Sequence, residues 1–332
     1  MIEPPYLASA SRYDDVKLER CGKSGIQLPR ILLGFWHNFG ATSPLDNCRA
    51  IVRTAFDHGI VSLDLANNYG PPYGSAEETF GKIFRDDFKA YRDELFIATK
   101  AGYDMWPGPY GNWGSRKYLM ASLDQSLKRM GLDYVDVFYS HRYDPETPLD
   151  ETLTALVDIV RQGKALYVGI SRWPQPAQAY AFKFLEEHGC HCLLFQDRIN
   201  IFDREPVESG KLQTAMDAGV GFVAFSPLAQ GLLTNRYLNG IPQGSRATKS
   251  KFLHADQITP ELISRISKLA ELAAQRGQTL AQMAVAWVLA HPGVTSAIVG
   301  SSSPAQLLDT ISACDNLSFT DEELKIIDSL QK

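Results

Sequence analysis

The sequence predicts an α/β fold, a parallel (β/α)8 barrel of the TIM type with an N-terminal hairpin and extra helices. Eight short apolar runs rich in β-branched and aromatic residues recur along the chain. They are nearly continuous rather than alternating, which is typical of strands covered on both faces. Segments with helical spacing separate them, and 332 residues is a common length for one such barrel. We therefore expect residues 1–332 to form a single domain.

Each apolar run is short and is bounded by turn-forming or polar residues, as barrel strands are. Parallel strands leave all their carboxyl ends on one face of a barrel, so the residues at these ends are expected to gather there. The runs are 31–35, 61–66, 95–100, 135–141, 165–171, 192–196, 221–227 and 296–301.

Helical segments lie between the runs. The second of them opens at Ser75, where Glu78 three residues later predicts a capping box. Several others close on a glycine, which is a common helix terminator. The expected helical segments are 44–59, 75–88, 115–131, 149–163, 177–189, 205–219 and 303–314.

Two additions to the barrel are expected. Residues 16–29 form a small hairpin that turns between Gly22 and Gly25 and closes the bottom of the barrel. The connection between the last two strands is too long for a simple crossover and carries an additional helix. Three helices are expected toward the C-terminus, over residues 258–277, 279–293 and 320–332.

Composition excludes several classes of protein. The net charge of −5 and the absence of a basic run argue against nucleic acid as a partner. No window approaches the roughly 20 apolar residues of a membrane helix, and the N-terminus is not a signal peptide. Five cysteines, an odd number, predict reduced thiols and a cytoplasmic location. The stretch 188–192 lacks a second ligand pair at metal-site spacing, so no metal is expected.

Ionisable side chains stand at three consecutive strand ends. Asp64 ends the second run with Tyr69 on the loop beyond it, Lys100 ends the third run, and His141 ends the fourth. Each alone is compatible with a structural role, but four at one end of one barrel indicate a catalytic site.

These four groups suit the delivery of a proton to an oxygen that gains negative charge. A tyrosine with a pKa of about 10 holds its proton near neutrality, and a neighbouring Lys100 ammonium would stabilise the phenolate. Asp64 would keep Lys100 charged, and His141 would hydrogen-bond a substrate oxygen. Such an arrangement protonates a carbonyl oxygen as hydride reaches carbon, and the hydride must come from a cofactor.

A nicotinamide site is expected at the other strand ends, because no G-x-G-x-x-G fingerprint is present. Ser171 and Gln196 can hold a carboxamide, and Phe225 can stack on a flat ring. The stretch 300–309 places amides and hydroxyls at a helix N-terminus, which suits phosphate. The long seventh loop adds Arg236 and Arg246, whose charge suits an extra phosphate.

Six motifs together resemble those of the aldo-keto reductase family over essentially the whole chain: "LDLANNYG", "IATKAG", "VDVFYSH", "GISRW", "FSPLAQGLL" and "IVGSSSPAQLLD". The resemblance implies a (β/α)8 barrel, NADPH/NADP+ and no metal. It also implies a catalytic tetrad of Asp64, Tyr69, Lys100 and His141, with Tyr69 as proton donor. The stretches "RYLNGIPQGSR" and "GQTLAQMAVAWVL" resemble the branch with bacterial L-glyceraldehyde 3-phosphate reductases and potassium channel beta subunits.

By the same resemblance a set of residues lines the cofactor. They are Trp36, Asp64, Ser171, Arg172, Gln196, Phe225, Ser226, Pro227, Leu228, Ala229, Gln230, Arg236, Arg246, Gly300, Ser302, Gln306 and Asp309. The chain departs from the wider family at three places, with Arg172 for an asparagine, Asp309–Thr310 for a glutamate and an asparagine, and Gly300 for a lysine. A preference for NADPH then depends on the remaining cationic and polar groups, Arg236, Arg246, Ser302 and Gln306.

The expected substrate is a small aldehyde or ketone such as L-glyceraldehyde 3-phosphate or methylglyoxal. Residues 103–114, with Trp106, Tyr110 and Trp113, form either an aromatic lip with Trp36 or plain loop packing. Arg142 either meets a substrate phosphate or is a solvated surface arginine.

The alternative function is that of an NADPH-sensing binding subunit that docks on a partner and turns over only incidentally. His141 favours the enzyme, since the channel-subunit relatives carry asparagine there. A homo-oligomer is also expected from the branch.

Overall fold

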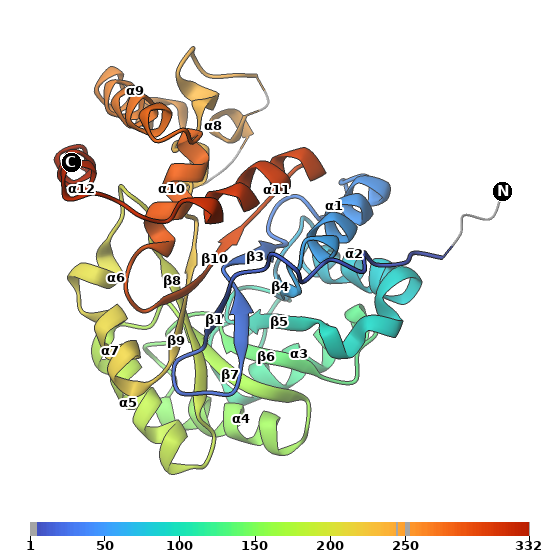
Figure 1. Cartoon of the computed structure of the whole chain (residues 1–332). Helices are drawn as coiled ribbons and strands as arrows, with labels where there is room; N and C mark the ends of the chain where they lie inside the picture. Colours follow the sequence, from blue (N-terminus) through green and yellow to red (C-terminus); the bar gives the residue numbers. More distant parts are fainter. Residues whose placement is uncertain (1–4, 244, 250–252, 332) are drawn as a thin grey trace.

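The computed structural model describes residues 5–243, 245–249 and 253–331, and its central element is a closed parallel barrel (Figure 1). The strand order is β10-β3-β4-β5-β6-β7-β8-β9. The (β/α)8 prediction is therefore confirmed. The barrel strands are β3 (Ile31–Gly34), β4 (Ser62–Asp64), β5 (Phe96–Ala101), β6 (Val135–Ser140), β7 (Ala165–Ser171), β8 (Cys192–Arg198), β9 (Gly221–Phe225) and β10 (Val294–Val299).

The last strand differs most from its predicted bounds. It begins and ends two residues earlier than the run 296–301, so Gly300 and Ser301 follow the strand. The polar residues Thr295 and Ser296 obscure its start in the sequence, yet both are buried and hydrogen-bonded. The Ser296 hydroxyl donates to the carbonyl of Pro29 at 2.7 Å.

The helices pack around the barrel as expected, and their apolar faces cover the strands. Those that alternate with strands are α1 (Leu45–Asp57), α2 (Ser75–Ile83), α3 (Arg116–Met130), α4 (Leu149–Arg161), α5 (Gln175–Glu187), α7 (Lys211–Ala218) and α11 (Pro304–Ile311). The others are α6 (Glu205–Glu208), α8 (Arg246–Lys249), α9 (Pro260–Gln275), α10 (Leu280–Leu289) and α12 (Asp321–Ser329). No described helix is both long and apolar enough to cross a membrane.

Two local predictions about helices are wrong. Ser75 is the first helical residue and not the N-cap, which is Gly74 with a φ of 87°. The Ser75 hydroxyl donates instead to the carbonyl of Pro72 at 2.6 Å, so the capping box does not form. The segment 205–219 is two helices, α6 and α7, because Gly210 adopts a left-handed φ of 80° between them.

The N-terminal hairpin closes the barrel bottom as predicted. β1 (Leu18–Arg20) pairs antiparallel with β2 (Gln27–Pro29). Gly22 has a φ of 50°, and a Cβ there would lie 1.9 Å from the carbonyl oxygen of Gly219, just before β9. Only glycine permits this approach. Cys21 and Leu28 of the hairpin are buried in a cluster with inward-facing barrel residues such as Val137.

Candidate active site

The four predicted catalytic residues gather at the carboxyl end of the barrel. Asp64 is the last residue of β4, Lys100 lies near the end of β5, and His141 directly follows β6. Tyr69 lies on the β4–α2 loop. Parallel pairing of β4 with β5 and of β5 with β6 sets these strand ends beside one another. The side chains of Asp64, Lys100 and His141 are buried.

Lys100 is the centre of the cluster. Its fully buried ammonium donates to Asp64 Oδ2 at 2.7 Å, to the carbonyl of Leu65 at 2.7 Å and to the Tyr69 hydroxyl at 3.3 Å. The three N–H groups of the ammonium therefore each have a partner. The other carboxylate oxygen of Asp64 accepts from Gln196 Nε2 at 2.9 Å, which fixes the carboxylate from the far side.

The His141 ring also lies beside the Tyr69 ring. The centroids of the two rings are 5.8 Å apart, with an interplanar angle of 73°. Tyr103 meets the His141 ring edge-on at 4.7 Å. Nδ1 of His141 is buried and has no hydrogen-bond partner within the described residues. A buried polar atom without a partner is costly and marks a candidate binding position.

Burial controls the protonation states of this cluster. It raises the pKa of Tyr69 well above its ordinary value, and the Asp64 charge adds to the effect, so the phenol stays protonated. Lys100 was expected to lower the pKa of the Tyr69 phenol, but the effect of burial on this pKa is larger. Burial also lowers the pKa of Lys100, which the Asp64 carboxylate opposes. Burial and the charges of Lys100, Arg172 and Arg142 lower the pKa of His141 well below its ordinary value, so the ring is neutral.

The depressed pKa of His141 predicts a pH-dependent stability. As pH falls through about 6.5 the unfolded chain takes up a proton at this histidine while the folded chain does not. The unfolding free energy should then fall by up to about 1.4 kcal/mol per pH unit from this group. We expect His141→Gln to flatten this slope between pH of about 6.5 and 5 in urea titrations. The control substitution His58→Gln, at an exposed histidine, should leave the slope unchanged. Equal slopes in the wild type and in His141→Gln would contradict the assignment.

Strained backbone marks the same face of the barrel. Within the described residues the non-glycine positions with positive φ all follow the carboxyl ends of barrel strands, a pattern typical of functional sites. They are His37, Trp113, Arg172, Ser226, Ala229 and Gln230. Four of them belong to the predicted cofactor contacts, and His37 adjoins a fifth, Trp36.

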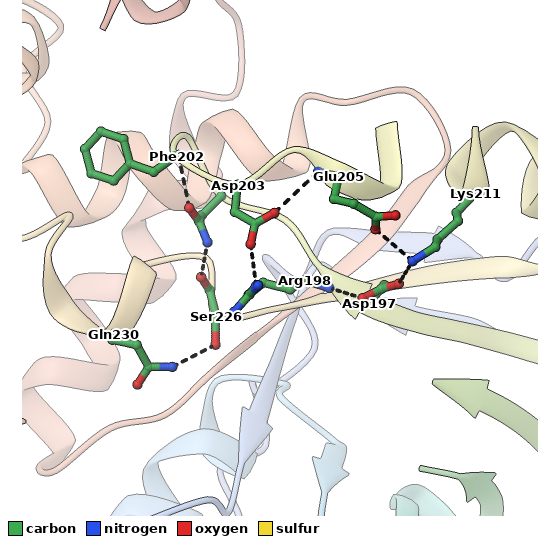
Figure 2. Close-up of polar contacts among 9 residues, drawn as sticks. Asp197, Arg198, Phe202, Asp203, Glu205, Lys211, Ser226 and Gln230 are labelled. Atoms are coloured by element: carbon green, nitrogen blue, oxygen red, sulfur yellow. Dashed lines mark hydrogen bonds and ion pairs between the residues drawn. The ribbon is translucent and has the colours of Figure 1, made fainter. Parts of the chain in front are cut away.

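Hydrogen bonds connect the segment after β9 to the residues that follow β8. Asn200 Nδ2 donates to the carbonyl of Ser226 at 3.2 Å, and Gln230 Nε2 donates to the Ser226 hydroxyl at 3.5 Å (Figure 2). Arg198 and Asp203 form an ion pair at 2.5 Å beside them. These residues line a cavity of about 230 Å³ together with Phe202, Ala229, Leu232, Leu253 and Gln257. Phe225, Ser226, Leu228 and Ala229 are half-buried along this segment, and Pro227 is buried.

The loop after β10 supplies polar groups near the start of α11. Gln306 Oε1 accepts from both the backbone N–H and the hydroxyl of Ser302, at 2.9 and 2.8 Å. The Ser301 hydroxyl is buried without a partner in the described chain. A Cβ on Gly300 would meet nothing closer than 3.9 Å, so the space above it is open.

The remaining predicted cofactor residues differ in their burial and in their contacts. Ser171 is buried at the end of β7, and the Trp36 ring contacts the His37 ring at a tilt of 37°, with centroids 3.8 Å apart. Asp309 accepts a hydrogen bond from Gln282 at 2.9 Å. Arg236 is exposed on the long loop, and the side chain of Arg246 lies outside the described residues.

Of the two alternatives for residues 103–114, an aromatic lip or plain loop packing, the lip forms only in part. A cavity of about 560 Å³ is lined by Trp106 and Trp113 together with Tyr73, and neither Trp36 nor Tyr110 lines it. None of the four predicted catalytic residues lines this cavity either, so the cavity is separate from the catalytic cluster. Arg142 is half-buried and not a solvated surface residue, with its guanidinium 3.6 Å from the Trp113 ring centroid.

Sequence reasoning missed three groups that contact the cluster. The Leu65 carbonyl gives no side-chain signal, and Tyr139 reads as an ordinary strand residue although the Lys100 ammonium lies 5.8 Å from its ring centroid. Tyr103 had a usable signal, because an aromatic residue three positions after Lys100 falls at the same strand end.

The carboxyl end of this parallel eight-stranded barrel carries a buried lysine, a buried carboxylate and a half-buried tyrosine, a combination that suits a barrel oxidoreductase. The sequence model of the Aldo/keto reductase family matches residues 30–332. The chain belongs to this family.

Relatives fall into two groups. The "L-glyceraldehyde 3-phosphate reductase" of Escherichia coli strain K12 is 53% identical over 327 residues, covering 97% of this chain and 94% of the relative. The "Probable voltage-gated potassium channel subunit beta" of Arabidopsis thaliana is 33% identical over 308 residues, covering 90% and 92%. A putative subunit of the same kind from Schizosaccharomyces pombe is 31% identical over 335 residues, covering 98% and 96%.

Proposed function

We propose that this chain acts as one domain, an NADPH-dependent reductase that converts small aldehydes and ketones to alcohols. The observation that carries the proposal is the contact of the Lys100 ammonium with both Asp64 and the Tyr69 hydroxyl, beside the neutral ring of His141. The proposed substrates include L-glyceraldehyde 3-phosphate, which the name of the Escherichia coli relative specifies, and methylglyoxal.

The chemistry of the surrounding donors fits NADPH, which when bound supplies the hydride. Gln196 and Ser171 offer amide and hydroxyl groups at adjacent strand ends, where a carboxamide would fit. The unpartnered Ser301 hydroxyl and the open space at Gly300 suit a phosphate-bearing ligand at the start of α11. Phe225, Ser226, Pro227, Leu228, Ala229 and Gln230 would line the opposite side.

Each of the four catalytic residues has a separate role in the proton transfer. Tyr69 gives its proton to the carbonyl oxygen as negative charge grows there, and Lys100 at 3.3 Å stabilises the phenolate that forms. Asp64 holds Lys100 charged and oriented from 2.7 Å. Neutral His141 offers a ring N–H that orients the carbonyl oxygen. Burial of the cluster strengthens each of these interactions by excluding water.

An NADPH-sensing binding subunit is the second candidate, because the chain is 33% identical to a probable channel beta subunit. The two candidates predict different behaviour. A reductase consumes NADPH in proportion to the aldehyde supplied, whereas a sensor binds NADPH tightly and consumes little of it when aldehyde is added. The neutral, buried His141 beside Tyr69 supports the reductase.

The test follows NADPH absorbance with methylglyoxal and, separately, with L-glyceraldehyde 3-phosphate, and repeats both with NADH. We expect aldehyde-dependent turnover that favours NADPH. Arg236→Ala should lower this preference by about tenfold or more, since a hydrogen bond to a charged group is worth about 1.5–3 kcal/mol. Exposed Arg85→Ala is the matched control. NADPH consumption that does not rise with added aldehyde would reject the reductase, and equal effects of Arg236→Ala on both cofactors would reject the role of Arg236.

A further inference from the structure

Arg142, the residue after His141, is held rigidly beside the candidate site. Its guanidinium lies 3.6 Å from the centroid of the Trp113 ring and 4.4 Å from that of Tyr103. Nε donates to the carbonyl of Gly102 at 2.7 Å, and Nη2 donates to Asn112 Oδ1 at 2.7 Å. These contacts fix the orientation of the group, as cation–π stacking and paired hydrogen bonds do.

The contacts leave one edge of this guanidinium without a protein partner. Nε and Nη2 form the edge that faces Gly102 and Asn112, whereas Nη1 has no hydrogen-bond partner among the described residues. The neighbouring carboxylates are engaged elsewhere. Asp144 accepts from Gly114 N at 2.9 Å and from the Thr147 hydroxyl at 2.6 Å, and Asp104 accepts from Asn112.

A second arginine faces the same tyrosine. Arg172 follows β7 in a left-handed conformation with a φ of 57°, and its Nη1 donates to the Tyr103 hydroxyl at 3.3 Å. Tyr103 therefore contacts both arginines and also the His141 ring. Within the described chain no carboxylate lies within ion-pair distance of Arg142 or Arg172. Arg142 adjoins His141 in the chain, and Arg172 contacts Tyr103, whose ring centroid is 4.7 Å from that of His141, so both arginines lie near His141.

Backbone geometry holds this arrangement in place. Gly102 lies between β5 and the residues after β6, and a Cβ there would come within 3.0 Å of His141 Cβ and 3.1 Å of the Arg142 amide. A side chain at this position would crowd both residues, so glycine suits the close approach of the two strand ends.

We propose that Arg142 and Arg172 bind an anionic group of the substrate and make the enzyme selective for short carbonyl compounds that carry one. The proposal rests on the reductase function above. Planar guanidinium groups match the oxygens of phosphate and carboxylate, and two of them without carboxylate partners attract such a group into the site. Because both charges lie close to His141, the anion is separated from the carbonyl by only a few bonds.

Matched aldehydes test the proposal. The charged substrates are glyceraldehyde 3-phosphate and succinic semialdehyde, and the uncharged partners are glyceraldehyde and butyraldehyde. The readout is the ratio of kcat/KM for the charged over the uncharged member of each pair. We expect a ratio above about ten in the wild type for at least one pair, and the pair that shows it identifies phosphate or carboxylate as the preferred anion.

Variants identify the residues responsible. Arg142→Gln and Arg172→Gln should each lower the ratio about tenfold. Arg161→Gln removes an exposed arginine at the other end of the barrel and should leave the ratio unchanged. Asn112→Ala loosens the loop contact of Arg142 but keeps its charge, so it should lower the ratio less than Arg142→Gln does.

Three results would overturn the proposal. The first is a wild-type kcat/KM ratio near one for both pairs, and the second is a ratio that neither arginine substitution changes. The third is an equal loss of the ratio in Asn112→Ala and Arg142→Gln, which would show that the shape of the loop determines selectivity. In each case the uncharged aldehydes are still reduced, so the reductase function stands. If the wild type reduces none of the aldehydes with NADPH, the reductase function fails and the proposal fails with it.

Discussion

Tyr69→Phe is expected to lower kcat for aldehyde reduction by about 10²- to 10⁴-fold, the usual contribution of a positioned general acid. The phenol is held protonated by burial and is 3.3 Å from the Lys100 ammonium, so it is the group best placed to give a proton. Phenylalanine keeps the ring and its packing and removes only the hydroxyl. Steady-state kinetics with saturating NADPH and methylglyoxal measure the effect.

The control for this experiment is Tyr103→Phe, which removes a hydroxyl from a neighbouring ring that also contacts His141. It should lower kcat far less, because the Tyr103 hydroxyl meets Arg172 and not Lys100. Affinity for NADPH, measured by fluorescence titration, should be similar in all three proteins. Equal kcat values in the wild type and Tyr69→Phe would remove Tyr69 as the donor.

Lys100→Met is expected to destabilise the fold by about 3–5 kcal/mol and to abolish detectable turnover, because it leaves the Asp64 carboxylate buried without its charge partner. Both side chains of the pair are almost fully buried, and their atoms are 2.7 Å apart. The exposed pair Lys164–Asp124 provides the contrast, and Lys164→Met should cost less than about 1 kcal/mol. Urea unfolding measures both values.

A double variant separates the charge from the packing. Asp64→Asn combined with Lys100→Met removes both charges and keeps an acceptor for Gln196, so it should be more stable than Lys100→Met alone. It should still be inactive. A double variant no more stable than the single one would show that the lost stability comes from packing and not from an unpaired carboxylate.

The barrel and its catalytic end were predictable because both depend on local patterns. Continuous apolar runs indicate strands covered on both faces, and parallel strands bring their ends together, so Asp64, Lys100 and His141 could be grouped without coordinates. The bounds of β10 were less accurate, since Thr295 and Ser296 are satisfied by long-range hydrogen bonds that the sequence does not reveal.

Features set by tertiary context were not predictable. Ser75 has the sequence of a helix cap, but the left-handed Gly74 takes that position and the serine hydroxyl bonds to Pro72 instead. Arg142 resembles a surface arginine in the sequence and becomes a fixed group only when Trp113 and Tyr103 fold over it. The pKa of Tyr69 likewise follows from its burial, which outweighs the adjacent lysine.

The most direct test of the central claim is a crystal structure with NADP+ and a carbonyl-containing inhibitor bound. We expect the inhibitor oxygen within about 3 Å of both the Tyr69 hydroxyl and a ring nitrogen of His141, with the nicotinamide ring against the carbonyl carbon. A nicotinamide bound away from this cluster, or a Tyr69 hydroxyl turned away from both Lys100 and the inhibitor, would contradict it.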